Sequence, residues 1–516
     1  MKGWKAVLGC SYESLALFRI LLGSLLLLEL VLRFRFLHPF YSDEGTLPLS
    51  LLLEKVDSLY KIVCIHCHFG SLFEQQVLLS VQVLVAFLFT IGFRTQWTSI
   101  ISWYLYLSLT LRNTWMSYIL DRYFHYLLFL SIFLPIGECW GVSSSRGKAP
   151  AQRLVISPGT VAFKALVVWI YIDAGYGKYC DPLGGWFYNA DPLPALDTYA
   201  RHTLPAQYLY ALIGPPGLRL LTPIVLYVEI FAAPLAILGS FLGSKRIIYT
   251  AIALICSLHI GIAITLRNAA LLSFVACVAW CAFLPLGWNN IETEGQSRDD
   301  QAQNTKRSSI SGSSLAGQIF SLLCILTMVC GNIWLETISR ACDQSVKHIW
   351  STLLHNRWNV FVGAEEYVTW EIAPGQLRDG SIVDVWGKKM EVDWRLPGSG
   401  APCTATGRPG RWRSFPYLAG LEGEDGDALW RYLCWEWNNQ HVVDGHHEKE
   451  LLRYNFFMLQ ADVLPNMGFS ATRKRLIKSF ECLPSSENAE SIPLTDEAGD
   501  PSATEPKQFD EIHEEL

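Results

Sequence analysis

The residues best suited to chemistry in this sequence lie in one short stretch, Tyr171 to Trp186. The stretch contains Asp173 and Lys178 and follows an apolar run, so both ionisable side chains are expected at or just inside a membrane boundary. A lysine in apolar surroundings gives up its proton more readily, because desolvation disfavours the ammonium form, and it can then serve as a base. The alternative is a lysine that extends toward lipid headgroups or is neutralised by Asp173.

Glycines interrupt the same stretch. Gly175 and Gly177 lie between Asp173 and Lys178, and this spacing predicts that a helix breaks there. Irregular backbone at membrane depth is tolerated only where it is buried in protein or lines a cavity. The sequence therefore predicts a cavity beside Lys178.

Several other ionisable residues fall within or at the ends of apolar runs. They are Arg19, Glu29, Asp121, Arg122, His125, Glu229 and His259. A charged side chain that faces lipid without a partner costs a few kcal/mol, so these residues are expected to face the interior of a helix bundle. Glu29 and Arg33 have the i,i+4 spacing of a local ion pair. His259 has no such local partner, which makes it the second catalytic candidate after Lys178, with Asp121, Arg122, Asp173 and Glu229 as supporting polar residues.

The sequence Cys64-Ile-His66-Cys67-His68 contains residue types that bind zinc. It lacks a second ligand cluster at a recognisable spacing, so no metal site is predicted. A disulfide between Cys64 and Cys67, or between Cys403 and Cys434, is left open by the sequence.

The composition indicates which elements carry these residues. Hydrophobic residues make up 51% of the 516 positions and charged residues 17%, against about 45–50% and about 25% in soluble domains. The chain thus belongs with membrane proteins, and a lipid membrane is its expected partner. No basic stripe or nucleic-acid motif is present, which argues against a nucleic-acid partner.

Apolar runs predict an all-α polytopic membrane domain. A helix needs about 20 apolar residues to cross the hydrocarbon core. By this measure the sequence predicts nine transmembrane helices, near residues 15–32, 76–93, 97–111, 119–136, 160–172, 220–242, 247–266, 269–286 and 318–338.

Changes in composition divide the chain. Residues 1–290 form the predicted transmembrane domain, 291–317 a flexible linker and 318–340 the last transmembrane helix. Residues 341–482 are predicted to form a small α+β extramembrane module, with a strand near 382–386 and a helix near 428–438, and residues 483–516 a disordered acidic tail. A slight bias in the placement of Lys and Arg predicts a cytosolic N-terminus and a lumenal or extracellular module, in a membrane that the sequence does not identify.

A series of motifs carries a family resemblance. The series includes Phe18-Arg19-Ile20, Phe40 to Gly45, Ala174-Gly175-x-x-Lys178, His259-Ile-Gly-Ile and Phe283-Leu-Pro285. In this order, over residues 11 to 290, it resembles the HTTM family, the horizontally transferred transmembrane proteins. This family is distantly similar to vitamin K-dependent gamma-glutamyl carboxylase. The resemblance implies that Lys178 acts as a base on reduced vitamin K or another quinone, with His259 close to the same site.

Departures from the carboxylase limit what the resemblance implies. Gly177-Lys178 stands where the carboxylase has two lysines, and the segment from Arg112 to Tyr118 contains no histidine where the carboxylase has one. The extramembrane module is also smaller, and no protein substrate is indicated. The leading hypothesis is a membrane-embedded, carboxylase-like enzyme. The alternative is a non-catalytic scaffold or a lipid- or quinone-binding protein, and the sequence does not separate the two.

Overall fold

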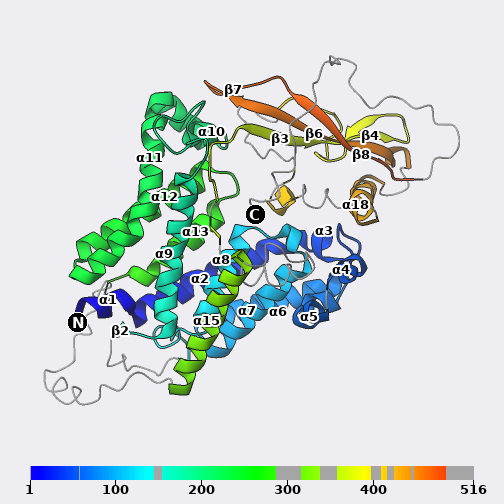
Figure 1. Ribbon diagram of the computed structural model, residues 1–516. Helices are drawn as coiled ribbons and strands as arrows, with labels where there is room; N and C mark the ends of the chain where they lie inside the picture. Colours follow the sequence, from blue (N-terminus) through cyan, green and yellow to red (C-terminus); the bar gives the residue numbers. More distant parts are fainter. Residues whose placement is uncertain are drawn as a thin grey trace.

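A helical bundle and a sheet-containing module make up the computed structural model of the chain (Figure 1). The structure describes residues 2–56, 58–143, 154–285, 315–337, 357–358, 360–396, 408, 410–414, 424–442 and 447–483. Cys403, most of the predicted linker at 291–317 and all but the first residue of the predicted acidic tail at 483–516 lie outside these residues.

The N-terminal half of the bundle begins with α1 (Lys2–Leu8) and the long helix α2 (Tyr12–Arg33). Short helices then cross one end of the bundle: η1 (Phe34–Phe36), α3 (Leu37–Tyr41), α4 (Leu49–Lys55), α5 (Ser58–Val63) and η2 (Ile65–His68). They are followed by α6 (Leu72–Ile91), α7 (Thr95–Arg112), η3 (Thr114–Met116) and α8 (Ile119–Ser131). Side chains define where the long helices begin: the Ser71 and Glu74 side chains bond the backbone reciprocally at the start of α6.

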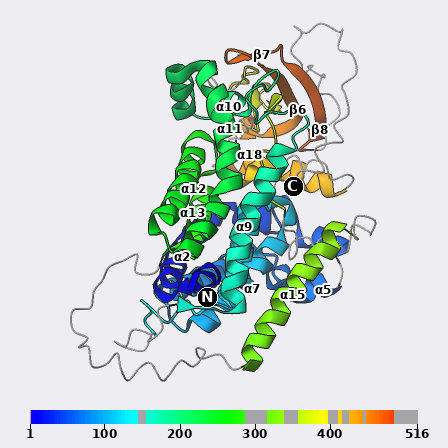
Figure 2. The ribbon, with the colours of Figure 1, turned by 60° about the vertical axis from the view of Figure 1, so that its left-hand side comes forward.

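The second half of the bundle is built on α9 (Pro158–Tyr179), which Ser157 caps and Pro158 starts. A small two-stranded sheet, β1 (Cys10–Ser11) with β2 (Leu154–Val155), ties the start of this half to α2. The remaining helices are α10 (Ala195–Tyr199), α11 (Leu204–Leu242), α12 (Lys245–Thr265), α13 (Ala270–Ala279), η4 (Trp280–Phe283) and α15 (Leu315–Thr337). Helices α9, α11, α12 and α13 lie side by side, whereas α15 lies at the periphery (Figure 2).

Five helical segments among the described residues are long and apolar enough to cross a membrane, which is consistent with a multi-pass membrane protein. They lie at Tyr12–Tyr41, Leu72–Ile91, Leu204–Leu242, Lys245–Thr265 and Leu315–Asn332. The prediction of nine transmembrane helices is not confirmed. Helices also occur at the other four positions, but α8 has 13 residues and α13 has 10, which is short for a 30 Å hydrocarbon core, and α9 carries three charged residues.

The C-terminal module is α+β, as predicted. Its central strand β6 (Leu451–Leu464) pairs with β3 (Tyr367–Ile372), β4 (Pro374–Leu377), β7 (Gly468–Phe469) and β8 (Arg473–Glu481), all antiparallel, and β5 (Ile382–Asp384) adds to β4. Helical elements of the module are η6 (Gly410–Ser414), α18 (Glu424–His441) and η7 (His447–Lys449). Strand β5 and helix α18 confirm the two elements that the sequence predicted there.

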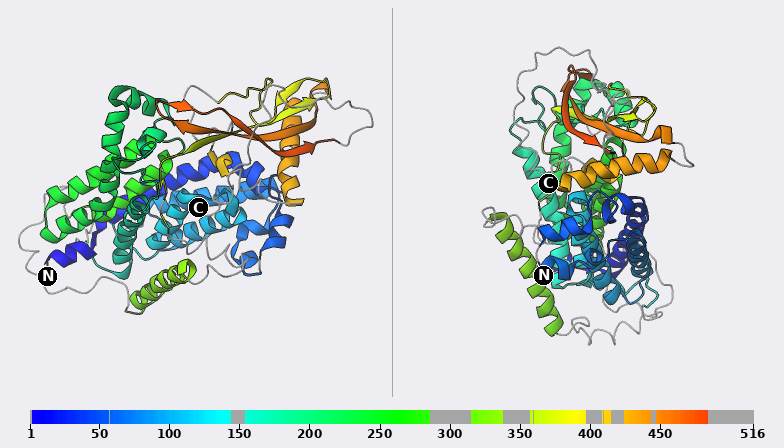
Figure 3. Two further views of the ribbon diagram at one scale, coloured as in Figure 1. Left: turned by 45° about the horizontal axis from the view of Figure 1, so that its top comes forward. Right: turned by 90° about the vertical axis from the view of Figure 1, so that its right-hand side faces the viewer.

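The module lies over one end of the bundle (Figure 3). Aromatic contacts join the two parts: His38 stacks on Trp435 with ring centroids 4.4 Å apart, and Phe40 meets Trp412 at 4.6 Å. One continuous hydrophobic core contains residues of α2 and residues of α18. The module is therefore packed against the bundle and covers the helix ends that carry the candidate site residues.

Candidate functional site

Lys178 is buried in the last turn of α9, where only 3% of its side chain is exposed. Its Nζ lies 2.9 Å from Oε2 of Glu229 on α11, whose side chain is 8% exposed. The same Nζ donates to the Val360 carbonyl at 3.1 Å and lies 5.3 Å from the centre of the Trp186 ring. Lys178 therefore contacts a carboxylate, a backbone carbonyl and an aromatic face, all from other segments of the chain.

The predicted helix break beside Lys178 is wrong. Helix α9 continues through Gly175 and Gly177 to Tyr179. Gly175 has a packing role instead, since a Cβ there would lie 2.6 Å from Cγ1 of Ile230 on α11. A glycine in a helix interior costs about 1 kcal/mol relative to alanine, which close packing of two helices offsets. The glycines thus give no evidence for a cavity beside Lys178.

Asp173 does not pair with Lys178, although the sequence left that pairing open. Its Oδ2 accepts a hydrogen bond from the Trp358 backbone N–H. Neighbouring groups hold the same segment of the module: Trp186 Nε1 donates to the Phe361 carbonyl at 2.9 Å, and the Tyr199 hydroxyl donates to the Gly363 carbonyl at 2.7 Å. The end of α9, the loop that follows it and α10 therefore bind the backbone at residues 358, 361 and 363.

His259, on α12, belongs to a second polar pair. Its Nε2 forms a 2.6 Å hydrogen bond with the Tyr171 hydroxyl, and its Nδ1 is buried with no hydrogen-bond partner among the described residues. Tyr171 is seven residues before Lys178 on α9, so the two buried side chains lie on the same face about two turns apart. The structure thus places Lys178 and His259 in adjacent pairs rather than in one hydrogen-bonded group.

Asp121, at the start of α8, lies in a separate buried ionic cluster. Arg33 Nη2 contacts Asp121 Oδ1 at 2.5 Å and also Glu29, which confirms the predicted pair of Glu29 and Arg33. Arg411, from η6 of the module, contacts Asp121 at 2.8 Å and Glu29 at 2.8 Å. The Tyr106 hydroxyl donates to Asp121 at 2.9 Å. Two carboxylates and two guanidinium groups thus balance in charge where the module enters the bundle.

Arg122 faces a different neighbour from Asp121. Its Nη1 donates to the Arg357 carbonyl at 2.6 Å, next to the segment that Asp173 holds. These contacts place Asp121 and Arg122 at the boundary between bundle and module.

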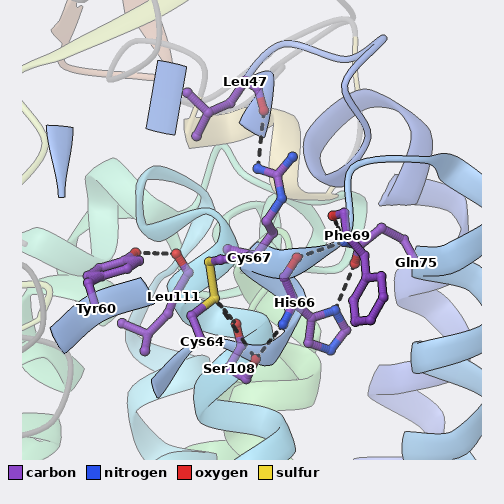
Figure 4. The surroundings of a disulfide bond; sticks show 10 residues. Leu47, Tyr60, Cys64, His66, Cys67, Phe69, Gln75, Ser108 and Leu111 are labelled. Atoms are coloured by element: carbon purple, nitrogen blue, oxygen red, sulfur yellow. Dashed lines mark hydrogen bonds between the residues drawn. A yellow bond between two sulfur atoms is a disulfide. The ribbon is translucent and has the colours of Figure 1, made fainter. Parts of the chain in front are cut away.

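The two cysteines of the zinc-like motif form a disulfide, Cys64–Cys67 (Figure 4). Between them, His66 Nδ1 bonds Gln75 at 2.7 Å and its backbone N–H donates to Ser108 at 2.9 Å. A cysteine binds a metal as a thiolate, and the two sulfurs of this disulfide provide no thiolate. A second disulfide joins Cys434 to Cys482, rather than to Cys403.

Sequence reasoning missed three contributors: Tyr171, Arg411 and the Val360 carbonyl. Tyr171 shares the helical face of Lys178, and this spacing could have identified it. Arg411 has no local signal in the sequence, because its carboxylate partners are 290 positions away, at Asp121, and 382 positions away, at Glu29.

Comparison of the chain with protein-family models, with curated proteins and with solved structures gives no match.

Proposed function

We propose that this multi-pass membrane protein is an HTTM-like, membrane-embedded enzyme in which Lys178 and Glu229 exchange a proton during chemistry on a quinone-like lipophilic cofactor. The observation that carries the proposal is the buried contact of 2.9 Å between the two side chains. The proposal keeps the carboxylase-like reaction that the motif resemblance implies, and it replaces the isolated lysine base with a pair.

Burial lowers the free-energy cost of proton transfer from Lys178 to Glu229, because it disfavours the two charged forms. Removing two ions from water costs several kcal/mol for each, and the mutual attraction of the ions offsets only part of that cost. Transfer of one proton from Lys178 to Glu229 removes both charges and leaves an amine and a carboxylic acid. The pair can therefore rest as an ion pair and supply an amine base when a reacting group approaches.

One feature of the neighbouring pair fits a quinone. His259 Nδ1 is a buried polar atom without a partner among the described residues. The Tyr171 ring lies beside the His259 ring, and the Trp280 ring packs against Tyr171. An aromatic surface with one unpaired nitrogen suits a flat ring that carries oxygen atoms. When bound, a reduced quinone would supply acidic hydroxyl groups and electrons for reaction with oxygen. His259 and Tyr171 would orient it, and Lys178 would hold the transferred proton.

The test measures oxygen-dependent turnover of reduced vitamin K by the purified full chain, with Lys178→Arg and Lys178→Ala as variants. Arginine keeps the positive charge beside Glu229 but does not deprotonate in proteins. We expect Lys178→Arg to remain folded and to lose at least about 100-fold in turnover, the usual contribution of a general base. Full turnover by Lys178→Arg would contradict the proposal.

A non-catalytic scaffold or lipid- or quinone-binding protein is the second candidate. The observation that favours it is that Lys178 and Asp173 both hold the 358–363 segment of the module. In that case wild-type protein shows no turnover, Lys178→Ala lowers the melting temperature, and Lys178→Arg, which keeps the ion pair, does not.

The proposed orientation has a cytosolic N-terminus and a lumenal or extracellular module. Support comes from the disulfides Cys64–Cys67 and Cys434–Cys482, which lie in the loop region and in the module that contact each other through His38 and Trp435. Disulfides persist in oxidising compartments. Cleavage of the module by protease added outside sealed cells or inside opened microsomes tests this orientation, and cleavage only from the cytosolic side would contradict it.

A further inference from the structure

A pocket of about 270 Å³ opens where the bundle meets the module, away from Lys178 and His259. Its walls come from the end of α2 and η1, from the start of α13, and from η6 of the module. Leu32 and Leu271 contribute apolar wall, and Glu29, Arg35 and Arg411 contribute charge. The pocket therefore combines an apolar surface with ionic groups at the end of an apolar helix that is long enough to cross a membrane.

Glu29 offers an unused hydrogen-bond acceptor to this pocket. Its Oε1 accepts from Arg33 Nε at 2.8 Å and from Arg411 Nη2 at 2.8 Å. Its Oε2 is buried and has no hydrogen-bond partner among the described residues. A buried carboxylate oxygen without a donor destabilises the folded protein, so a ligand with an N–H or O–H group would stabilise the site.

Arg35 offers a cation at the same pocket, with its guanidinium 5.7 Å from the centre of the Phe36 ring. Its Nε donates to the Leu32 carbonyl, and the residue is exposed. Its two terminal nitrogens make no hydrogen bond within the described part of the chain, unlike those of Arg33 and Arg411, which the carboxylates occupy. A guanidinium group in this state suits a phosphate or carboxylate oxygen.

From these groups we infer that the pocket binds a zwitterion with a primary ammonium group close to a phosphate, the head-group chemistry of an aminophospholipid. The ammonium donates to Glu29 Oε2, the phosphate accepts from Arg35, and the first carbons of the acyl chains lie along Leu32 and Leu271. The inference is independent of the proposed chemistry at Lys178. The same head-group chemistry exists in free phosphoethanolamine, and the test separates the two sources.

The experiment uses the full chain in nanodiscs of phosphatidylcholine that contain a minor fraction of phosphatidylethanolamine. Lipid retained after a detergent wash is quantified by mass spectrometry. Phosphatidylcholine is the matched lipid control, because its quaternary ammonium has no N–H to donate to Glu29. We expect phosphatidylethanolamine to be enriched on the wild-type protein, and Arg35→Ala to retain about tenfold less, since a charged hydrogen bond contributes about 1.5 kcal/mol or more.

Two further variants keep the result interpretable. Leu271→Trp fills the pocket without touching a charge and is expected to lower retention as Arg35→Ala does. Arg267→Ala removes an exposed cation near the pocket that does not line it, and retention should stay unchanged. Equal retention of both lipids by the wild type, or equal losses in Arg35→Ala and Arg267→Ala, would overturn the inference. Displacement of bound lipid by soluble phosphoethanolamine would support the site and assign it to the free zwitterion; retention in its presence would assign it to the lipid.

Discussion

At the residue scale, the structure gives several charged side chains partners that the sequence did not predict. Lys178 is paired with Glu229, a residue that the sequence placed only as one more intramembrane charge. The pairing could not be read from the sequence, because the partners are 51 positions apart and lie on different helices, α9 and α11. The local pair of Glu29 and Arg33 could be predicted, since the i,i+4 spacing on one helix fixes it.

Glu371 gives a residue-scale prediction about pH. It is buried in β3 with Oε2 unpartnered among the described residues, and burial raises its pKa from 4.5 to about 7. The folded module then binds more protons than the unfolded chain between these values, so the free energy of unfolding should fall as pH rises from about 4.5 to 7. The expected loss is about 3 kcal/mol.

Denaturant titrations of the full chain in detergent at pH 5 and pH 8, followed by tryptophan fluorescence, measure this loss. Glu371→Gln should abolish most of the pH dependence of the module transition. The exposed carboxylate Glu366 provides the matched control, and Glu366→Gln should leave the dependence intact. If the free energy of unfolding of Glu371→Gln depended on pH as strongly as that of the wild type, another group would be responsible.

At the element scale, η6 acts as the connection between module and bundle. Arg411 reaches from η6 to Asp121 on α8 and Glu29 on α2. The neighbouring Gly410 is required for close approach, since a Cβ there would lie 2.7 Å from the Phe36 ring and its φ is +68°. The sequence predicted strand β5 and helix α18 from local patterns, but a single turn such as η6 has no local pattern that indicates what it contacts.

Arg411→Met should destabilise this connection strongly. The variant leaves Arg33 as the one guanidinium that contacts the buried carboxylates of Asp121 and Glu29 among the described residues. Removal of one partner from a buried ion pair costs about 3–5 kcal/mol of folding stability, because it leaves a buried charge uncompensated. We expect faster hydrogen–deuterium exchange in η6 and α18, and a lower melting temperature. The control is Arg395→Met, which removes an exposed ion pair with Asp393 that contributes about 0–1 kcal/mol. Equal effects of the two variants would contradict the assigned role of Arg411.

At the scale of the whole molecule, the sequence predicted a membrane bundle followed by an α+β module, and the structure has both. Hydropathy alone predicted nine transmembrane helices, whereas five helical segments of the described residues are long and apolar enough to cross a membrane. Helices α8 and α13, with 13 and 10 residues, lie at two of the other four positions. Hydropathy also gave no indication that the module shares one core with the bundle. The helix break predicted at Gly175 and Gly177 is wrong for a related reason, since Gly175 of α9 serves the packing of two helices.

The most direct test of the central claim is the protonation state of Glu229 while reduced vitamin K is bound. Infrared difference spectra of the full chain, recorded with and without the quinol, report carboxylic acids separately from carboxylates. Proton exchange with Lys178 predicts a new carboxylic-acid band on quinol binding, and the band should be absent from Glu229→Gln and from Lys178→Arg. A wild-type spectrum in which Glu229 stays a carboxylate would contradict the account and leave the pair with a purely structural role.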